Sequence, residues 1–255
     1  MRITLLGTGT SVGIPFIGCN CAVCNSSDIK DKRLRTAALV ETGNLTIAID
    51  CGPDFRQQML KHQVTRLDAI LLTHAHKDHT GGLDDIRAFN VWQNKPMPVF
   101  ATEPTQTILK KQYDYVFAEN RYEGAPHVVL NTIEHQPFII ENQLTVTPVY
   151  AIHGNSPVVG FRIGNFTYLT DANFITPEEE AKIAGSELMV VNALRLTKHW
   201  SHFSLSEALE LANRLQIPHT YFTHISHQMG LHRDVEQNLL PDHVRLGYDG
   251  LVLTL

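Results

Sequence analysis

The sequence predicts an α/β fold in which two β-sheets pack face to face and helices cover both outer faces, a four-layer αββα sandwich. Strand-like and helix-like segments alternate through the first half of the chain, and a strand-rich second half ends with strands and helices again. Clusters of polar residues directly follow several of the apolar strands. We expect residues 1–255 to form a single domain.

The first half begins with a strand at Met1–Gly7 and a glycine-rich turn at 7–11. No Gly-Lys-Ser/Thr follows this turn, so we interpret it as a backbone turn and not as a phosphate loop. Gly43-Asn44 separates two strand segments, 36–41 and 45–50, and predicts a hairpin. Further elements are predicted as a helix from Pro53 to about His62, a strand at 68–73, a helix from Leu83 to Val91, a strand from Pro98 to Ala101 and a helix from Pro104 to Phe117.

The second half contains another hairpin, because Gly164-Asn165 separates strand segments at 158–163 and 166–170. Ser204 and Glu207 have the spacing of a capping box, which predicts an amphipathic helix that ends at Leu215. The other elements expected here are a strand at 144–150, a helix at 177–183 and strands at 188–191 and 220–223.

Composition excludes several classes of protein. The net charge of -5 argues against a generally basic nucleic-acid binder, so we expect no stable nucleic-acid partner. No apolar run approaches the roughly 18 residues that span a membrane, and the first residues are too soon interrupted to form a signal peptide. Three of the four cysteines lie close together, which suits a metal site in a reducing compartment. We therefore expect a cytoplasmic protein without a membrane partner.

The densest group of metal-ligand side chains follows the strand at 68–73. His74, His76, Asp78 and His79 fall within six residues, and imidazole and carboxylate are preferred ligands of zinc, manganese and iron. Residues i and i+2 of an extended segment share a side, so His74 and His76 can face one ion. Asp78 and His79 are adjacent where the chain turns and can reach a second ion. The spacing predicts a dinuclear centre with metals about 3.5–4 Å apart.

Three further candidate ligands, His153, Asp171 and His224, each stand directly after an apolar strand. A single His in such a place is most often an ordinary surface or core residue. Three polar residues at three strand ends, beside the cluster that begins at His74, favour ligation of the same pair of ions.

A second group of candidate ligands lies near the N-terminus, where Cys19, Cys21 and Cys24 have the spacing Cys-x-Cys-x-x-Cys. Three thiolates supply all but one ligand of a tetrahedral zinc site. The alternatives are three buried reduced thiols or a redox pair, although the flanking sequence lacks the strand–helix pattern of a thioredoxin-like motif.

The spacing His-x-His-x-Asp-His from His74 to His79 resembles the signature of metallo-β-lactamase-fold hydrolases. The resemblance implies the same αββα architecture. It also implies that His74, His76 and His153 bind the first metal, that Asp78, His79 and His224 bind the second, and that Asp171 bridges both.

Three further motifs are similar to those of the PhnP-type cyclic-phosphate phosphodiesterases: Gly18-Cys19-x-Cys21-x-x-Cys24, Thr223-His224-Ile225-Ser226-His227-Gln228 and Gly247-Tyr248-Asp249-Gly250. This resemblance implies a structural Zn²⁺ held by Cys19, Cys21, Cys24 and His227, in a Cys-rich loop at about 16–35, and it implies a homodimer. Cys51 competes as the fourth ligand, but we expect it to be a buried free thiol.

The same resemblance implies that His202 faces the substrate without binding metal, where it hydrogen-bonds a phosphoryl oxygen or protonates the leaving alkoxide. His199 is the competing candidate for this role. Asp78 is assigned to catalysis as well as to the second metal. The other six histidines show no site pattern: His62, His127, His135, His219, His232 and His243.

The predicted function is hydrolysis of small, cyclic phosphodiesters by attack of a metal-bound hydroxide, with two Mn²⁺ or Zn²⁺ ions at the site. One alternative is a tRNA 3′-end endonuclease, but only residues 154–170 separate His153 from Asp171, which leaves no room for the substrate-gripping arm of those enzymes. A glyoxalase-type thioester hydrolase shares the motif and stays open. A non-catalytic metal-binding scaffold would not explain the complete ligand set.

Overall fold

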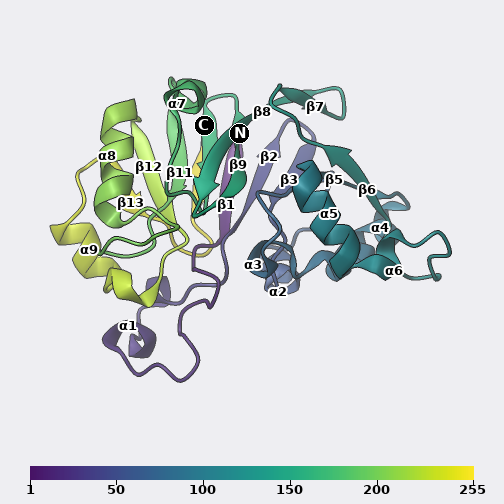
Figure 1. Ribbon diagram of the computed structural model, residues 1–255. Helices are drawn as coiled ribbons and strands as arrows, with labels where there is room; N and C mark the ends of the chain where they lie inside the picture. Colours follow the sequence, from purple (N-terminus) through teal and green to yellow (C-terminus); the bar gives the residue numbers. More distant parts are fainter.

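The computed structural model describes residues 1–255 and has the four-layer αββα architecture that the sequence predicts (Figure 1). Two seven-stranded sheets face one another, and helices cover their outer faces. No helix combines the length and the apolar composition that crossing a bilayer requires.

The first sheet has the strand order β14-β1-β2-β3-β4-β5-β6, with β3 to β6 parallel to one another. Its strands are β1 (Arg2–Gly7), β2 (Ala37–Thr42), β3 (Leu45–Ile49), β4 (Ala69–Leu71), β5 (Met97–Ala101), β6 (Val128–Thr132) and β14 (Val252–Thr254). The helices of this half are α2 (Phe55–Lys61), α3 (Lys77–Thr80), η2 (Leu83–Ile86), α4 (Arg87–Gln93), α5 (Glu103–Gln112) and α6 (Asp114–Phe117).

The second sheet has the order β13-β12-β11-β10-β9-β8-β7, with β10 to β13 parallel. Its strands are β7 (Phe138–Ile140), β8 (Leu144–His153), β9 (Ser156–Ile163), β10 (Phe166–Leu169), β11 (Leu188–Asn192), β12 (His219–Thr223) and β13 (Val244–Leu246). The helices of this half are α7 (Pro177–Ile183), α8 (Leu205–Leu215) and α9 (His232–Asn238), and the short helices α1 (Ala22–Asn25), η1 (Ile29–Asp31) and η3 (His227–Met229) lie in loops.

Three separate apolar clusters fill the spaces between the four layers. The central cluster joins the sheets and includes Phe161, Phe166 and Tyr168, all fully buried. The two others lie under the helices of each sheet, around Phe55 on one side and Phe222 on the other. Each large side chain removed from water contributes about 1.5–3 kcal/mol, so burial on both faces of each sheet explains the nearly continuous apolar strands in the sequence.

The helix predicted from Pro104 to Phe117 is broken at Tyr113 into α5 and α6. Tyr113 leaves the helical region (φ -125°, ψ 46°), and its buried ring allows the hydroxyl to donate to Thr80 O at 2.8 Å. That tertiary hydrogen bond overrides local helix propensity. The capping box of Ser204 and Glu207 forms as predicted and begins α8, which ends at Leu215.

The topology brings the ends of several strands to one edge. β8 and β10 run in the same direction because both pair antiparallel with β9, and β12 is parallel to β10 through β11. The last residue of β8 is His153, Asp171 follows β10 by two residues, and His224 follows β12 directly. The end of β4 in the other sheet reaches the same place, since Val159 N donates to Thr73 O at 3.0 Å.

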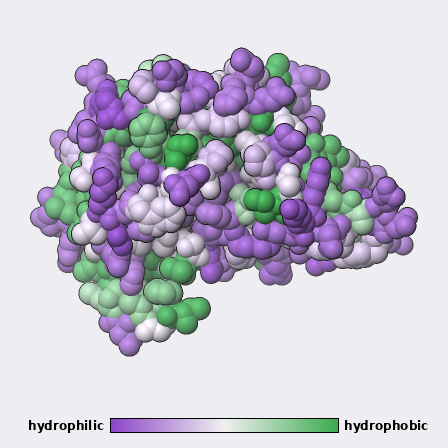
Figure 2. Space-filling model, in the orientation of Figure 1, coloured by the Kyte–Doolittle hydropathy of each residue, from purple (hydrophilic) through white to green (hydrophobic).

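The Cys-rich segment projects from the sandwich as a small lobe around α1 (Figure 1). Its own buried cluster consists of Ile14, Val23 and Cys24 only. Apolar side chains gather on the outside of the lobe (Figure 2), where Ile17 is 92% exposed and Ile29 is 77% exposed. So small a buried cluster cannot hold the lobe in one conformation by itself, because a few side chains bury too little apolar surface.

Candidate metal centre

The first group of candidate ligands is His74, His76 and His153, whose ring nitrogens lie within 4.8 Å of one another. His74 Nε2 is 2.9 Å from His76 Nδ1, and the ring of His153 completes the triangle at 5.1 Å from the His76 ring. His153 Nδ1 lies 2.8 Å from Ser201 O, a carbonyl that can only accept, so Nδ1 carries the proton. That hydrogen bond leaves His153 Nε2 with a lone pair for an ion.

The second group is Asp78, His79, Asp171 and His224, drawn from the loop after β4 and the ends of β10 and β12. His79 Nε2 lies 3.2 Å from Asp78 Oδ2 and 3.4 Å from Asp171 Oδ1. His224 Nε2 lies 3.5 Å from Asp78 Oδ2 and 3.3 Å from Asp171 Oδ2. The carboxylate of Asp171 therefore faces both histidines, and its Oδ2 also lies 3.9 Å from His74 Nε2 in the first group.

These contacts fit a bound cation better than hydrogen bonds. His79 Nε2 and both ring nitrogens of His224 are buried and have no hydrogen-bond partner, which is rare for buried polar atoms. Ligands about 2.1 Å from a tetrahedral ion are separated by about 3.4 Å, close to the spacings in the second group. The donor set of imidazole and carboxylate suits zinc or manganese.

The charges of the site favour a cation as well. Burial alone would raise the pKa of Asp171, but His224 and His79 hold it well below its usual range, so the carboxylate is ionised. Burial lowers the pKa of His79, yet Asp171, Asp50 and Asp78 outweigh burial and raise it well above the ordinary value. Asp78 and Asp171 lie next to His79 Nε2, and the negative charge that favours a proton on the ring also favours a metal ion at that atom.

Asp50 is a site residue that our sequence reasoning missed. It is fully buried after β3, and its carboxylate accepts from His79 Nδ1 at 2.7 Å and from Thr73 Oγ1 at 2.9 Å. Thr73 Oγ1 in turn lies 3.0 Å from His74 Nδ1. One carboxylate thereby orients a histidine of each group and leaves both Nε2 atoms directed at the site. The signal was its position directly after an apolar strand, which Asp50 shares with Asp171 and His224.

Three residues at strand ends adopt left-handed backbone conformations that residues other than glycine seldom adopt. Asp50 has φ 66°, Asp171 has φ 61° and His224 has φ 53°. Each of these turns directs a side chain from the end of a strand into the site. The clustering of unusual backbone at one place is typical of functional sites.

His202 lies against both groups of ligands. Its ring is 4.6 Å from His153 and stacks on His224 at 4.7 Å, and its Nδ1 is buried, without a hydrogen-bond partner, 3.9 Å from Asp171 Oδ2. Burial lowers the pKa of His202 to about 3, so the imidazole is neutral at pH 7. His199 lies farther out, 5.3 Å from the His202 ring, and its Nδ1 accepts from Ser201 N at 3.3 Å.

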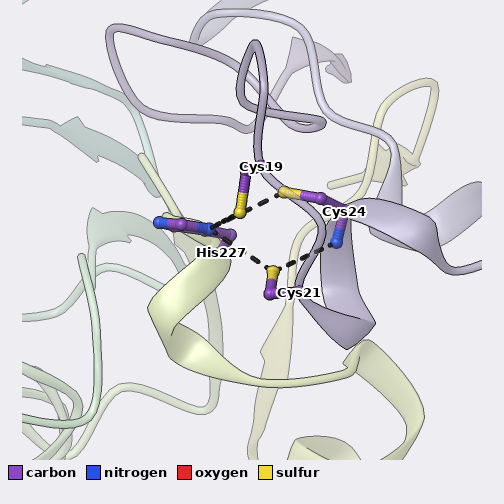
Figure 3. Close-up of side chains that lie close together, drawn as sticks. All are labelled: Cys19, Cys21, Cys24 and His227. Carbon is purple, nitrogen blue, oxygen red and sulfur yellow. Dashed lines mark hydrogen bonds between the residues drawn. The ribbon is translucent and has the colours of Figure 1, made fainter.

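Cys19, Cys21, Cys24 and His227 converge on one point, although they come from opposite ends of the chain (Figure 3). His227 Nδ1 lies 3.2, 3.5 and 3.6 Å from the three sulfurs in that order. These distances fit the edges of a tetrahedron with Zn–S bonds of about 2.3 Å. The backbone N–H of Cys24 lowers the pKa of Cys21 to about 6, whereas burial raises the pKa of Cys24 to about 11, so Cys21 forms a thiolate more readily than Cys24.

Cys51 lies elsewhere, fully buried in the apolar cluster under the helices of the first sheet, where burial raises the pKa of its thiol. It is a free cysteine, as the sequence analysis expected. Asp249 of the Gly247–Gly250 motif accepts from Leu34 N at 2.6 Å and from Thr8 Oγ1 at 2.8 Å. That motif ties the C-terminal segment to Leu34 at the end of the Cys-rich segment and to Thr8, which precedes it.

Two facing sheets with a His- and Asp-lined centre at one edge define a metal-dependent hydrolase of the metallo-β-lactamase fold. Residues 46–225 match the family described as Beta-lactamase superfamily domain. The chain belongs to this family. Its resemblance to PhnP-type proteins is supported by a crystal structure described as a new diphosphatase from the PhnP family. The two chains are 36% identical and superpose with a TM-score of 0.92, and the match covers 100% of this chain and 97% of that chain.

Curated relatives give a less uniform picture. An octanoyltransferase from Porphyromonas gingivalis is 41% identical over 98% of this chain, but the match covers 51% of that protein. A ribonuclease Z from Mycolicibacterium paratuberculosis is 26% identical over 64% of this chain and 58% of its own length. The chain thus spans about half the length of these relatives. Zn²⁺-bound PqqB from Methylobacterium extorquens, at 20% identity and a TM-score of 0.78, shares the fold.

Proposed function

We propose that this chain is a dinuclear-metal phosphodiesterase that hydrolyses small phosphodiesters, cyclic ones included. The observation that carries the proposal is the position of Asp171 between two groups of candidate ligands, with Oδ1 3.4 Å from His79 Nε2 and Oδ2 3.9 Å from His74 Nε2. The 36% identity to a PhnP-family diphosphatase supports chemistry at phosphorus.

In this proposal His74, His76 and His153 would hold one ion, Asp78, His79 and His224 would hold the other, and the Asp171 carboxylate would contribute an oxygen to each. Two divalent ions held by these residues would supply Lewis-acid polarisation of the phosphoryl group and activation of a water molecule. Mn²⁺ and Zn²⁺ both suit these ligands.

The chain's own contribution is to fix and orient these groups. Asp50 holds His79 directly and His74 through Thr73, and Ser201 O holds His153, so the ligand nitrogens are directed at the site before metal binds. His202 is neutral at pH 7 and acts through an N–H hydrogen bond to a phosphoryl oxygen, the first of the two roles considered for it. Asp78 serves catalysis as a ligand of the second ion.

We also propose that Cys19, Cys21, Cys24 and His227 hold a structural Zn²⁺. His227 begins η3, three residues after His224, and Ser226 caps the turn by accepting from Gln228 N at 3.2 Å. A zinc ion on His227 thus anchors the loop that supplies a catalytic-site ligand. Free thiols at these positions suit a reducing cytoplasm, and the PhnP resemblance implies a homodimer.

A diphosphatase is the second candidate, favoured by the name of the 36% identical solved structure. A diphosphate linkage also presents a phosphorus with two substituents. Transfer-RNA processing is disfavoured, because β9 and β10 account for most of the segment between His153 and Asp171. The octanoyltransferase name belongs to a protein about twice the length of the match, so it gives no assignment for this chain.

A substrate panel tests the proposal. We expect protein reloaded with Mn²⁺ or Zn²⁺ to cleave bis(4-nitrophenyl) phosphate and 2′,3′-cyclic AMP. Hydrolysis of 4-nitrophenyl phosphate is expected to be slower by roughly 10²-fold or more, because a monoester brings extra negative charge next to the site's carboxylates. Initial rates of nitrophenolate release and chromatography of the nucleotide products measure both.

The panel also separates the competing functions. A nucleoside diphosphate sugar cleaved faster than either diester would favour the diphosphatase. Faster hydrolysis of S-lactoylglutathione would assign the chain to the thioester hydrolases, and turnover of none of these substrates by fully loaded protein would exclude the proposal.

Replacing His202 tests its assignment to the substrate. We expect His202→Ala to lower kcat roughly 10²-fold, the usual effect of removing one preorganised donor, while metal content and melting temperature stay at wild-type values. Steady-state kinetics together with elemental analysis check this. The loss should shrink for nitrophenyl esters if His202 protonates the leaving group, since nitrophenolate departs without a proton.

His199→Ala is the matched control, because His199 is a neighbouring imidazole without contact to the ligand groups, and its effect on kcat should be small. A reversed order of the two variants would transfer the role to His199. If His202→Ala instead loses metal, His202 is itself a metal ligand. Its position allows this, because the possible ligand atoms of His202, His153 and Asp171 lie within 4.8 Å of one another.

A further inference from the structure

The aromatic ring of Trp200 lies beside the candidate metal centre, yet 71% of the residue is exposed. A Cβ atom on Gly154 would lie 2.2 Å from Cζ3 and 2.8 Å from Cη2 of Trp200, so one end of the indole rests directly on the Gly154 backbone. Gly154 follows His153, the last residue of β8. The position of the indole therefore depends on the absence of a side chain next to a candidate ligand.

The support under Trp200 is itself fixed. Gly154 has φ 62°, and its N–H donates to Asn173 Oδ1 at 2.7 Å. Asn173 N also donates to Ile152 O at 2.8 Å, which joins the segment after Asp171 to the end of β8. The indole thus rests on backbone held by the same strand ends that form the metal centre, while most of its surface faces solvent.

A row of rings leads from Trp200 into the centre. The Trp200 and His199 rings are 6.2 Å apart with planes 36° from parallel, and the His199 and His202 rings are 5.3 Å apart at 39°. His202 then contacts His153 at 4.6 Å. The row therefore connects the exposed indole with the candidate metal ligands through a continuous series of neighbouring rings.

We propose that Trp200 is a stacking platform for a planar ring of the substrate, such as the base of a nucleotide. This inference rests on the proposed phosphodiesterase function and adds the substrate class, which is a phosphodiester that carries an aromatic group. Stacking suits this position, because an indole offers a large flat surface and accepts any base without a specific hydrogen bond.

Trp92 on α4 provides a matched comparison, because the chain has two tryptophans and both are exposed. Trp92 is 82% exposed and borders an apolar groove with Phe55, Met59 and Phe89. No candidate metal ligand lines that groove. The two side chains therefore share their chemistry and exposure but differ in their position relative to the site.

Two single-tryptophan proteins test binding without turnover. In Trp92→Phe all tryptophan emission comes from Trp200, and in Trp200→Phe it comes from Trp92. We expect AMP to quench the emission of metal-loaded Trp92→Phe saturably and to leave that of Trp200→Phe unchanged. Ribose 5-phosphate, which has the sugar phosphate without the base, should quench neither. Quenching of both proteins or of neither by AMP overturns the platform.

Kinetics test the same platform in the reaction. The quantity to compare is the ratio of kcat/KM for 2′,3′-cyclic AMP to kcat/KM for a diester without an aromatic ring, such as dimethyl phosphate. Trp200→Ala should lower this ratio roughly 5–100-fold, the range found for removing a stacked aromatic side chain. Most of the change should come from a higher KM for 2′,3′-cyclic AMP. Trp200→Phe should restore part of this ratio, and Trp92→Ala should leave it unchanged. Two outcomes would show that Trp200 only covers Gly154. One is an unchanged ratio in Trp200→Ala, and the other is an equal loss of kcat/KM for both diesters together with a lower melting temperature.

These results are distinguishable from failure of the proposed function. If wild-type protein cleaves no diester, the phosphodiesterase is excluded while the quenching experiment still tests the platform. If wild-type protein cleaves both diesters and the ratio does not respond to Trp200, the function stands and the platform is wrong.

Discussion

Asp171→Asn is expected to lower kcat by roughly 10³–10⁴-fold, because the neutral amide weakens the link between the two groups of candidate metal ligands. The Lewis-acid contribution of a metal is several kcal/mol, and about 5 kcal/mol corresponds to that factor. Asparagine tolerates the left-handed backbone of Asp171 and occupies the same volume, so the fold should persist. Elemental analysis should find at least one of the two active-site ions lost or bound more weakly.

Asp68→Asn is the matched control for this variant. Asp68 is also buried, but it accepts from Thr46 N at 2.9 Å and pairs with Arg66 at 2.9 Å, away from both groups of ligands. We expect this control to lose stability without losing metal or intrinsic rate. Wild-type kcat in Asp171→Asn with both ions retained would refute the bridging role.

Cys21→Ser is expected to lower the melting temperature by about 8–16 °C and to remove one zinc ion per chain. Structural zinc contributes folding free energy, and a loss of about 4 kcal/mol shifts the melting temperature of a protein this large by about that amount. The effect should be large because the lobe has only a small buried apolar cluster, formed by Ile14, Val23 and Cys24, to hold it together without zinc. Calorimetry and zinc analysis on the same sample measure both quantities.

The second effect of Cys21→Ser should reach the active site. His227 and His224 belong to one short segment, so loosening of the lobe should weaken metal binding by His224 after the stability has already fallen. Cys51→Ala is the control, because Cys51 is a buried thiol outside the group and should retain all zinc. An unchanged melting temperature and zinc content in Cys21→Ser would mean that the three cysteines are ordinary buried thiols.

The fold could be predicted because both sheets leave simple traces in the sequence. Buried strands appear as apolar runs, Gly-Asn pairs mark two hairpins, and the Ser204–Glu207 pair begins α8 as expected. Elements that depend on tertiary contacts were predicted poorly. Tyr113 interrupts a helix because its hydroxyl reaches Thr80, and the three-residue strands β13 and β14 are too short to show a periodic pattern.

The candidate site could be predicted in part for a geometric reason. His153, Asp171 and His224 were selected because they follow strands, and this rule succeeds because β8, β10 and β12 run in the same direction and end at one edge. Their roles as ligands stay predictions. Asp50 was missed, since its contacts with His79 and Thr73 join segments whose proximity only the folded chain reveals. The pairing of His227 with the cysteines came from the family resemblance.

The left-handed strand ends have a consequence for directed evolution. Backbone of this kind at Asp50, Asp171 and His224 costs of the order of 1 kcal/mol or more at each residue, and glycine would relieve that cost. A laboratory selection for heat resistance alone would therefore reward glycine at three positions that the proposed metal centre uses. Thermostable descendants of this protein should be sought with those three positions held fixed, so that gains in melting temperature are not bought with the chemistry.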